Sequence, residues 1–108
     1  MTYDDIVKIG LEKPDVEDTM AWGTPALKRK KRFMLRLKED GESIAVKLDW
    51  DEHDRLLAAH PDVIYKTDHY EGYPAFLVRL QPLRDDLARE IIDLSWQNAP
   101  EKEVRRPK

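Results

Sequence analysis

Large apolar residues recur at every second position in two neighbouring runs of the chain, residues 33–37 and 44–48. A period of two indicates strands with one buried face. Asp40-Gly41 lies between the runs, and a two-residue Asp-Gly loop of type I′ pairs residues whose numbers sum to 81. We therefore predict a hairpin whose apolar side chains face one another in three pairs: Leu37 with Ile44, Leu35 with Val46, and Phe33 with Leu48.

Apolar residues at helical spacing predict three helices. The first spans about residues 3–12, and Thr2 with Asp5 forms a near capping box at its start. The second lies around residues 56–58 and stops at the His-Pro pair that follows, because the residue before proline disfavours helical backbone. The third spans about residues 83–98 and has one apolar face and one charged face.

Further strands are expected at residues 19–22, 63–66 and 75–80, the last two separated by a long loop. Short connections between strands favour antiparallel pairing, and apolar helix faces need a sheet to cover them. We therefore expect one domain, residues 1–108, with an α+β fold of two layers. It holds a mainly antiparallel five-stranded sheet packed with helices, in the order α-β-β-β-α-β-β-α. Residues 100–108 are expected to form a loosely ordered charged tail.

Positive charge is concentrated in one part of the chain. Residues 26–38 hold seven Lys or Arg and no Asp or Glu, although the formal net charge of the protein is -3. Because successive strand residues point to opposite faces, the predicted register places four cations together on the face away from the apolar side chains. These four are Arg32, Arg36, Lys38 and Lys47.

The consecutive basic residues 28–31 are expected to form the turn before the hairpin. The turn lacks the glycine that a tight primed turn prefers, so we expect a longer or more open loop. Its charge has two interpretations: a solvated surface, where an ion pair contributes about 0–1 kcal/mol, or a site for nucleic-acid phosphates. An overall pI near 5.6 favours the former. The candidate nucleic-acid-binding residues are Lys28, Arg29, Lys30, Lys31, Arg32, Arg36, Lys38 and Lys47.

No catalytic motif is visible. Without cysteine the chain forms neither a disulfide nor a thiolate site, and its serines and histidines lack the spacing of a nucleophile elbow or a paired metal site. We expect no enzymatic activity, no cofactor and no metal. The best candidates for acid–base chemistry or a ligand loop are His69, Tyr70 and Tyr73, with Asp68 beside them; the alternative is that these side chains close the loop by packing.

The three tryptophans have the same expected environment. All three are expected to be packed; the alternative for Trp22, which is next to Gly23, is that it lines a cleft. The chain shows neither a secretory signal nor an apolar run of membrane-spanning length, so we expect a cytoplasmic protein without a membrane partner.

Several segments of the sequence resemble the MmcQ/YjbR-like family. They are Trp22-Gly23-Thr24-Pro25-Ala26-Leu27-Lys28, Val46-Lys47, His69-Tyr70-Glu71-Gly72-Tyr73-Pro74, Leu77-Val78-Arg79-Leu80 and Ala99-Pro100. The resemblance covers almost the whole chain and implies a compact α+β fold of the secretion-chaperone-like kind, described as a double-wing DNA-binding domain. One departure concerns Arg29 and Lys30, which stand where relatives commonly carry an apolar residue and a glycine.

Three hypotheses for function follow. The first is a small non-catalytic protein that binds DNA through a basic β-hairpin, mainly by contacts to phosphates. The alternative is a protein–protein interaction module of the secretion-chaperone-like type, with no nucleic-acid role and a protein partner or second copy on its sheet. The third is a small-ligand role centred on the loop of His69, Tyr70 and Tyr73. The oligomeric state is left open.

Overall fold

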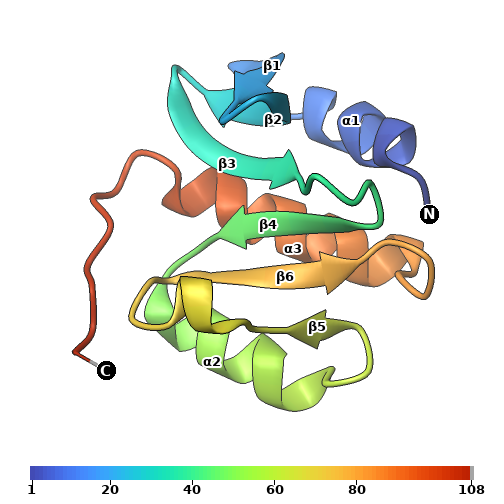
Figure 1. Ribbon diagram of the computed structural model, residues 1–108. Helices are drawn as coiled ribbons and strands as arrows, with labels where there is room; N and C mark the ends of the chain where they lie inside the picture. Colours follow the sequence, from blue (N-terminus) through green and yellow to red (C-terminus); the bar gives the residue numbers. More distant parts are fainter. Residues whose placement is uncertain (108) are drawn as a thin grey trace.

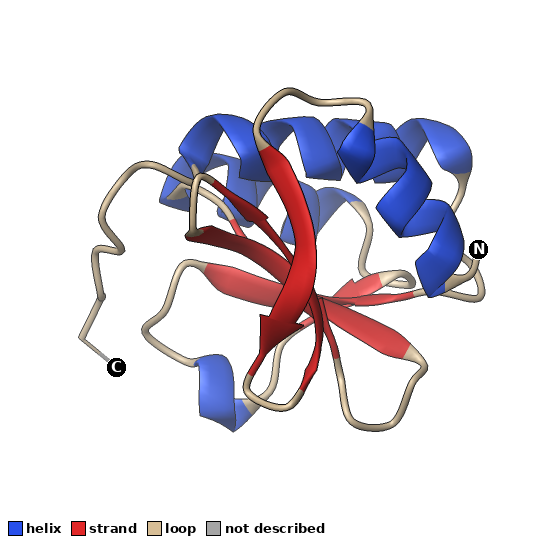
Figure 2. Cartoon of the chain, turned by 90° about the horizontal axis from the view of Figure 1, so that it is seen from above, coloured by secondary structure: helices blue, strands red, loops and turns tan. Residues whose placement is uncertain are grey.

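An antiparallel sheet of six strands, in the order β1-β2-β3-β4-β6-β5, forms one layer of the protein. The computed structural model describes residues 1–107, and Figure 2 shows the α-helices on one side of the sheet and a short 3-10 helix on the other. The elements are α1 (Tyr3–Leu11), β1 (Val16–Ala21), β2 (Thr24–Arg29), β3 (Arg32–Leu37), β4 (Ser43–Lys47), α2 (Trp50–Ala59), β5 (Ile64–Tyr65), the short 3-10 helix η1 (Asp68–Tyr70), β6 (Ala75–Arg79) and α3 (Asp85–Asn98). The predicted α+β class is confirmed (Figure 1).

The helices begin where the sequence places their caps. At α1 the Thr2 hydroxyl accepts the Asp5 N–H at 3.2 Å, while the Asp5 carboxylate accepts the Thr2 N–H at 2.9 Å, which completes the capping box. At α2 the Asp49 carboxylate accepts the Glu52 N–H at 2.8 Å. Within residues 1–107, none of these helices has the length and apolar character needed to cross a membrane.

The core lies between the helices and the sheet. Each fully buried Leu, Ile or Phe side chain there contributes roughly 1.5–3 kcal/mol to folding. The buried α3 hydroxyl of Ser95 donates to the Met34 carbonyl of β3 at 2.9 Å, which fixes the helix against the sheet. The largest core side chains include Ile6, Leu27, Met34, Leu35, Val46, Leu56, Phe76, Ile91 and Ile92.

The β3–β4 hairpin has the predicted register but a different loop. Leu37 pairs with Ile44 and Leu35 with Val46, as expected. The connection is a loop of four residues between Lys38 and Ser43, and the predicted type I′ turn is wrong, because only Gly41 in it takes left-handed backbone (φ +73°). This loop has its midpoint between Asp40 and Gly41, as the predicted two-residue loop would. The numbers of paired residues therefore still sum to 81, and the predicted register is kept.

A β-bulge in β3 changes which side chains face the helices. Pairing with β2 passes from Leu27–Leu35 to Lys28–Phe33, so Met34 is an extra residue in β3. The bulge moves the side chains of the residues before Met34 to the opposite faces of the sheet from those predicted. Phe33 therefore lies on the face away from the helices, and the predicted contact between Phe33 and Leu48 in the core is wrong.

The consecutive basic residues 28–31 are divided between strand β2 and the turn that follows it. Lys28 and Arg29 continue β2, where they pair with β1, and this additional strand raises the predicted count of five to six. Only Lys30 and Lys31 form the turn, both with left-handed backbone (φ +47° and +69°). Two such residues between paired strands are a type I′ turn, so the expectation of a longer, open loop over residues 28–31 is wrong.

Candidate functional site

A groove of about 600 Å³ opens on the face of the sheet away from the helices. It is bounded by β3, β4, the loop containing η1, and the C-terminal segment (residues 99–107). All three residues of the predicted ligand loop reach it. The lining residues are Trp22, Phe33, Arg36, Ala45, Lys47, Asp68, His69, Tyr70, Glu71, Tyr73, Ala75, Glu103 and Arg105.

Trp22 is the most exposed aromatic side chain of this groove, at 73%. Its backbone is left-handed (φ +50°), and its ring meets the edge of Phe33 at a centroid distance of 5.2 Å. The Arg36 guanidinium lies 5.6 Å from the centre of the indole ring. The expectation that Trp22 is packed is therefore wrong, and the alternative holds: Trp22 lines the groove, and the bulge that turned Phe33 outward supplies the second ring of the wall.

The cations predicted to share one strand face, which would be open to solvent if no helix covered it, are mostly held by protein groups. Arg36 is 7% exposed, and its guanidinium donates to the Thr24 hydroxyl and the Glu39 carboxylate, each at 3.1 Å. Lys38 donates to the Tyr70 hydroxyl at 3.2 Å and pairs with Glu39 at 3.4 Å. The Glu39 backbone N–H and then Arg36 lower the pKa of that carboxyl to about 2. A solvent-open cationic face is therefore the wrong description of Arg36 and Lys38.

Lys47 and Arg32 depart from the predicted face in different ways. The Lys47 ammonium donates to the carbonyls of Ala99 at 3.4 Å and Glu101 at 2.8 Å, and burial lowers its pKa. Arg32 is the strand partner of Arg29, so it lies on the side of α3 and not beside Arg36. The β-bulge is the reason, because it reversed the direction of every residue between itself and the turn.

Among the candidate nucleic-acid-binding residues, the most accessible positive charges lie at the end of the β2–β3 hairpin. Lys31 and Arg32 are exposed and Lys28 is partly exposed; within residues 1–107, no carboxylate lies within ion-pair distance of these three. Lys30 makes one loose contact, 3.7 Å from Asp15. Arg29 differs, because its guanidinium stacks on Trp96 at 3.9 Å and donates to the Trp96 carbonyl at 3.0 Å.

His69, Tyr70 and Tyr73 do not close their loop as a buried, mutually bonded cluster. His69 is exposed and touches the edge of the Tyr70 ring at 5.0 Å, while both tyrosines are half-buried at the groove. Within residues 1–107, no hydrogen bond joins the side chains of Asp68 and His69. The geometry therefore favours a ligand-contacting wall over an acid–base pair.

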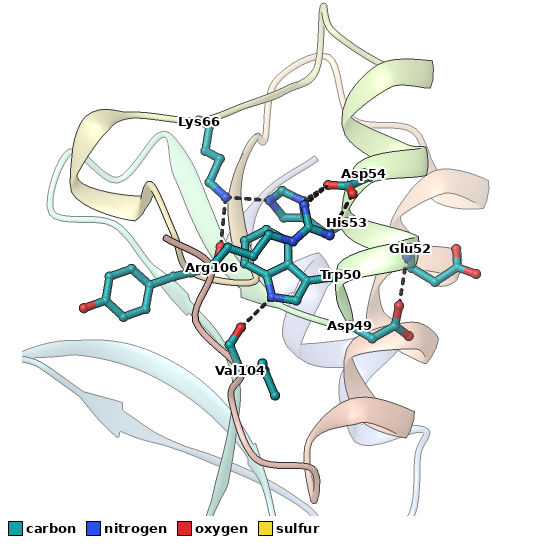
Figure 3. Close-up of polar contacts among 9 residues, drawn as sticks. Asp49, Trp50, Glu52, His53, Asp54, Lys66, Val104 and Arg106 are labelled. Carbon is teal, nitrogen blue, oxygen red and sulfur yellow. Dashed lines mark hydrogen bonds and ion pairs between the residues drawn. The ribbon is translucent and has the colours of Figure 1, made fainter. Parts of the chain in front are cut away.

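A buried polar cluster behind the loop was missed in the sequence. His53 is 2% exposed; its Nδ1–H donates to Asp54 at 2.9 Å, and its Nε2 accepts from the Lys66 ammonium at 2.8 Å (Figure 3). Lys66 also donates to the Tyr73 carbonyl at 2.8 Å, so the cluster fixes the end of the ligand loop. Burial lowers the pKa of both His53 and Lys66. Asp54 directly follows His53 in the sequence, but Lys66 lies on a different segment, so no local pattern signalled this arrangement.

The C-terminal segment contacts this cluster, and Lys108 lies outside the described residues. The Trp50 Nε1–H donates to the Val104 carbonyl, and the Arg106 N–H donates to the Gly72 carbonyl at 2.7 Å. The Arg106 guanidinium stacks on Trp50 at 3.8 Å and pairs with Asp54 at 3.0 Å (Figure 3). These contacts hold the segment at the rim of the groove.

The neutral state of His53 predicts a pH dependence of stability. Because burial lowers the folded-state pKa below the unfolded value of about 6.5, the stabilisation is present above that pH and is lost as pH falls through it. Urea unfolding between pH 7.5 and 5.5 should show a steeper loss for the wild type than for His53→Gln, by up to about 1.4 kcal/mol per pH unit. His69→Gln is the matched control at an exposed position. Equal slopes for the wild type and His53→Gln would contradict the prediction.

A second hollow, of about 680 Å³, lies near the start of α1 and the β3–β4 loop. Several of its polar groups are already engaged: the Ser43 and Tyr65 hydroxyls share a hydrogen bond of 3.0 Å, and Arg79 stacks on Tyr65 at 4.0 Å. The groove beside the basic hairpin is the stronger candidate site, because it brings together Trp22, His69, Tyr70 and Tyr73 from separate parts of the chain.

The fold and the groove define a small α+β domain with an aromatic hollow on its open sheet face. The chain belongs to the YjbR family, which it matches over residues 11–98. It is 32% identical over 92 residues to Uncharacterized protein Rv2570 of Mycobacterium tuberculosis and to Uncharacterized protein Mb2600 of Mycobacterium bovis. Each alignment covers 80% of this chain and 70% of the mycobacterial protein. The family resemblance predicted from the sequence is confirmed.

Proposed function

We propose that this protein is a non-catalytic nucleic-acid-binding protein whose β2–β3 hairpin contacts phosphates. The observation that carries the proposal is the accessible charge at the end of that hairpin. The contacting residues in this proposal are Lys28, Lys30, Lys31 and Arg32. Arg29, Arg36, Lys38 and Lys47 support the site instead, because their charged groups already bind Trp96, Glu39, Tyr70 and the C-terminal segment.

The conformation of the turn is a second support. A type I′ turn requires left-handed backbone at both central residues, and Asn-Gly is the pair that adopts it most easily. This chain has Lys30-Lys31 there, with φ +47° and +69°. Left-handed backbone costs a residue with a Cβ about 1–2 kcal/mol. Local strain is commonly retained at functional positions, so the lysines fit a role that requires charge at the tip.

Binding through these four cations predicts a characteristic salt dependence. Neutralising four phosphates gives a slope of log Kd against log salt of about 3 to 4 on duplex DNA. Lys31→Gln/Arg32→Gln removes two contacts and should reduce that slope to about 2. Fluorescence anisotropy with a labelled 20-base-pair duplex, titrated at several salt concentrations, measures both slopes.

Lys8→Gln/Arg84→Gln is the matched control, since it removes one exposed Lys and one exposed Arg on the helix side. This control should keep the wild-type slope. The absence of duplex and single-strand binding at low salt would refute the proposal, as would equal slopes for the two double variants.

A protein-interaction module is the second candidate. β1 is an edge strand of six residues, and Met20 is 55% exposed on it. Unpaired strand edges are templates for pairing with another chain. Sedimentation equilibrium tests self-association at this edge, and a monomer at all concentrations that still binds nucleic acid would eliminate pairing between copies.

A further inference from the structure

Four aromatic rings, from three separate parts of the chain, converge on the groove. Trp22 comes from the β1–β2 turn, Phe33 from β3, and Tyr70 and Tyr73 from the loop after β5. The Trp22 ring is positioned before any ligand arrives, because Phe33 and Arg36 contact it. It nevertheless remains 73% exposed. An exposed ring held in place is suited to stacking against a flat partner, at little cost in conformational entropy.

The charges that line the groove are balanced. Three lining cations, Arg36, Lys47 and Arg105, stand with three lining carboxylates, Asp68, Glu71 and Glu103. A cluster of phosphates would gain little from such a lining. A neutral planar ring with polar edges suits it better, because the aromatic walls contact its faces and the carboxylates of Asp68, Glu71 and Glu103 can accept hydrogen bonds from its edges.

The strand register places one cation of the proposed phosphate site next to the groove. Lys28 is the strand partner of Phe33, and partners directly opposite each other in a sheet point to the same face. Lys28 therefore lies beside the aromatic wall, between the groove and the tip at Lys30 and Lys31. Cations that follow a backbone next to rings that stack on bases are the usual arrangement in proteins that bind single strands.

We propose that the groove takes an unpaired nucleobase, with Trp22 as its stacking surface, so that the protein prefers single-stranded nucleic acid to a duplex. This inference rests on the proposed phosphate binding by the β2–β3 hairpin and adds the form of nucleic acid that the site accepts. A base within a duplex is already stacked and paired, and it cannot enter the groove without leaving the helix.

The test compares three labelled oligonucleotides by fluorescence anisotropy at constant salt: a 15-residue thymidine strand, the same strand paired with its complement, and a 15-residue abasic strand. The thymidine strand should bind most tightly. Trp22→Ala should weaken its binding by roughly 5- to 150-fold, the range expected for loss of one stacked base. Binding of the duplex and the abasic strand should stay unchanged.

Two further variants keep the result interpretable. Trp22→Phe retains a ring and should restore part of the thymidine-strand affinity, while Met20→Ala removes a neighbouring exposed apolar side chain that does not line the groove. Because the side chains of Trp22 and Met20 are both mostly exposed, all three variants should keep the wild-type melting temperature.

The outcomes separate the two proposals. Equal affinity for the thymidine and abasic strands, tighter duplex binding, or no effect of Trp22→Ala would overturn the base-binding groove and leave phosphate binding by the turn intact. If the protein forms a dimer that Trp22→Ala dissociates, the groove binds a second copy of the chain, and the base-binding proposal is overturned. A failure of every oligonucleotide to bind at low salt would refute the proposed function itself.

Discussion

Gly72→Ala is expected to lower the free energy of unfolding by about 2–5 kcal/mol. Gly72 has left-handed backbone (φ +82°), which costs alanine about 1–2 kcal/mol. A Cβ there would also lie 2.7 Å from the Arg106 carbonyl oxygen, a backbone atom. Relieving that overlap requires the C-terminal segment or the loop to move, which adds about 1–3 kcal/mol. Urea unfolding of the two proteins measures the difference.

Gly41→Ala separates the two contributions. Gly41 is also left-handed (φ +73°), but a Cβ there meets nothing within 4 Å. This control should show the backbone cost alone, about 1–2 kcal/mol. Equal destabilisation by the two variants would mean that the C-terminal segment does not press on Gly72 and would contradict the prediction.

Displacement of the C-terminal segment should also be visible at Trp50. The indole is covered by the Arg106 guanidinium and donates to the Val104 carbonyl. In the folded Gly72→Ala variant we expect a red-shifted Trp50 emission, best resolved with Trp22 and Trp96 replaced by Phe. The same movement would carry Glu103 and Arg105 away from the groove, which links the motif glycine to the shape of the site.

The double variant Lys30→Asn/Lys31→Gly is expected to be more stable than the wild type. Asn-Gly adopts the type I′ turn with less strain than two lysines, so the free energy of unfolding should rise by about 1–2 kcal/mol. For a domain of this size that raises Tm by roughly 4–10 °C. The same change removes two of the four proposed phosphate contacts and should weaken nucleic-acid binding.

Lys30→Gln/Lys31→Gln is the control for charge. It removes the same two cations but keeps residues with a Cβ in left-handed backbone, so it should weaken binding equally without the gain in stability. Thermal unfolding followed by circular dichroism, together with duplex titration, compares the variants. If Asn-Gly gives no gain over Gln-Gln, the turn is not strained and one support for the proposed function is lost.

Local signals in the sequence predicted much of the fold. The capping pair Thr2 and Asp5 and the stop before Pro61 depend on residues within one turn of each other, so helix positions follow from nearby chemistry. The β3–β4 register followed from the alternation of apolar residues, and it tolerated a wrong turn type because burial of one face fixes it.

The candidate site was predicted only in part. The motif residues Trp22, His69, Tyr70 and Tyr73 stood out in the sequence, and the structure brings them to one groove. Arg36, Lys38 and Lys47 share one strand face as predicted, but Arg32 does not, and the Arg36 charge is already engaged by Thr24 and Glu39. The position of a residue along a strand predicts which face of the sheet its side chain points to. Whether its charge is free to bind a ligand depends on the groups that other segments place next to it.

By itself the sequence determined the α+β class, the helix caps, the hairpin register and a run of cations in an acidic chain, because each depends on residues close together. Tertiary structure decided the rest. The bulge at Met34 turned Phe33 outward and Arg32 toward α3. Long-range contacts placed the C-terminal segment over His53 and Trp50. Bulges and long-range contacts depend on packing between distant segments, so no local pattern encodes which cations stay free for a ligand.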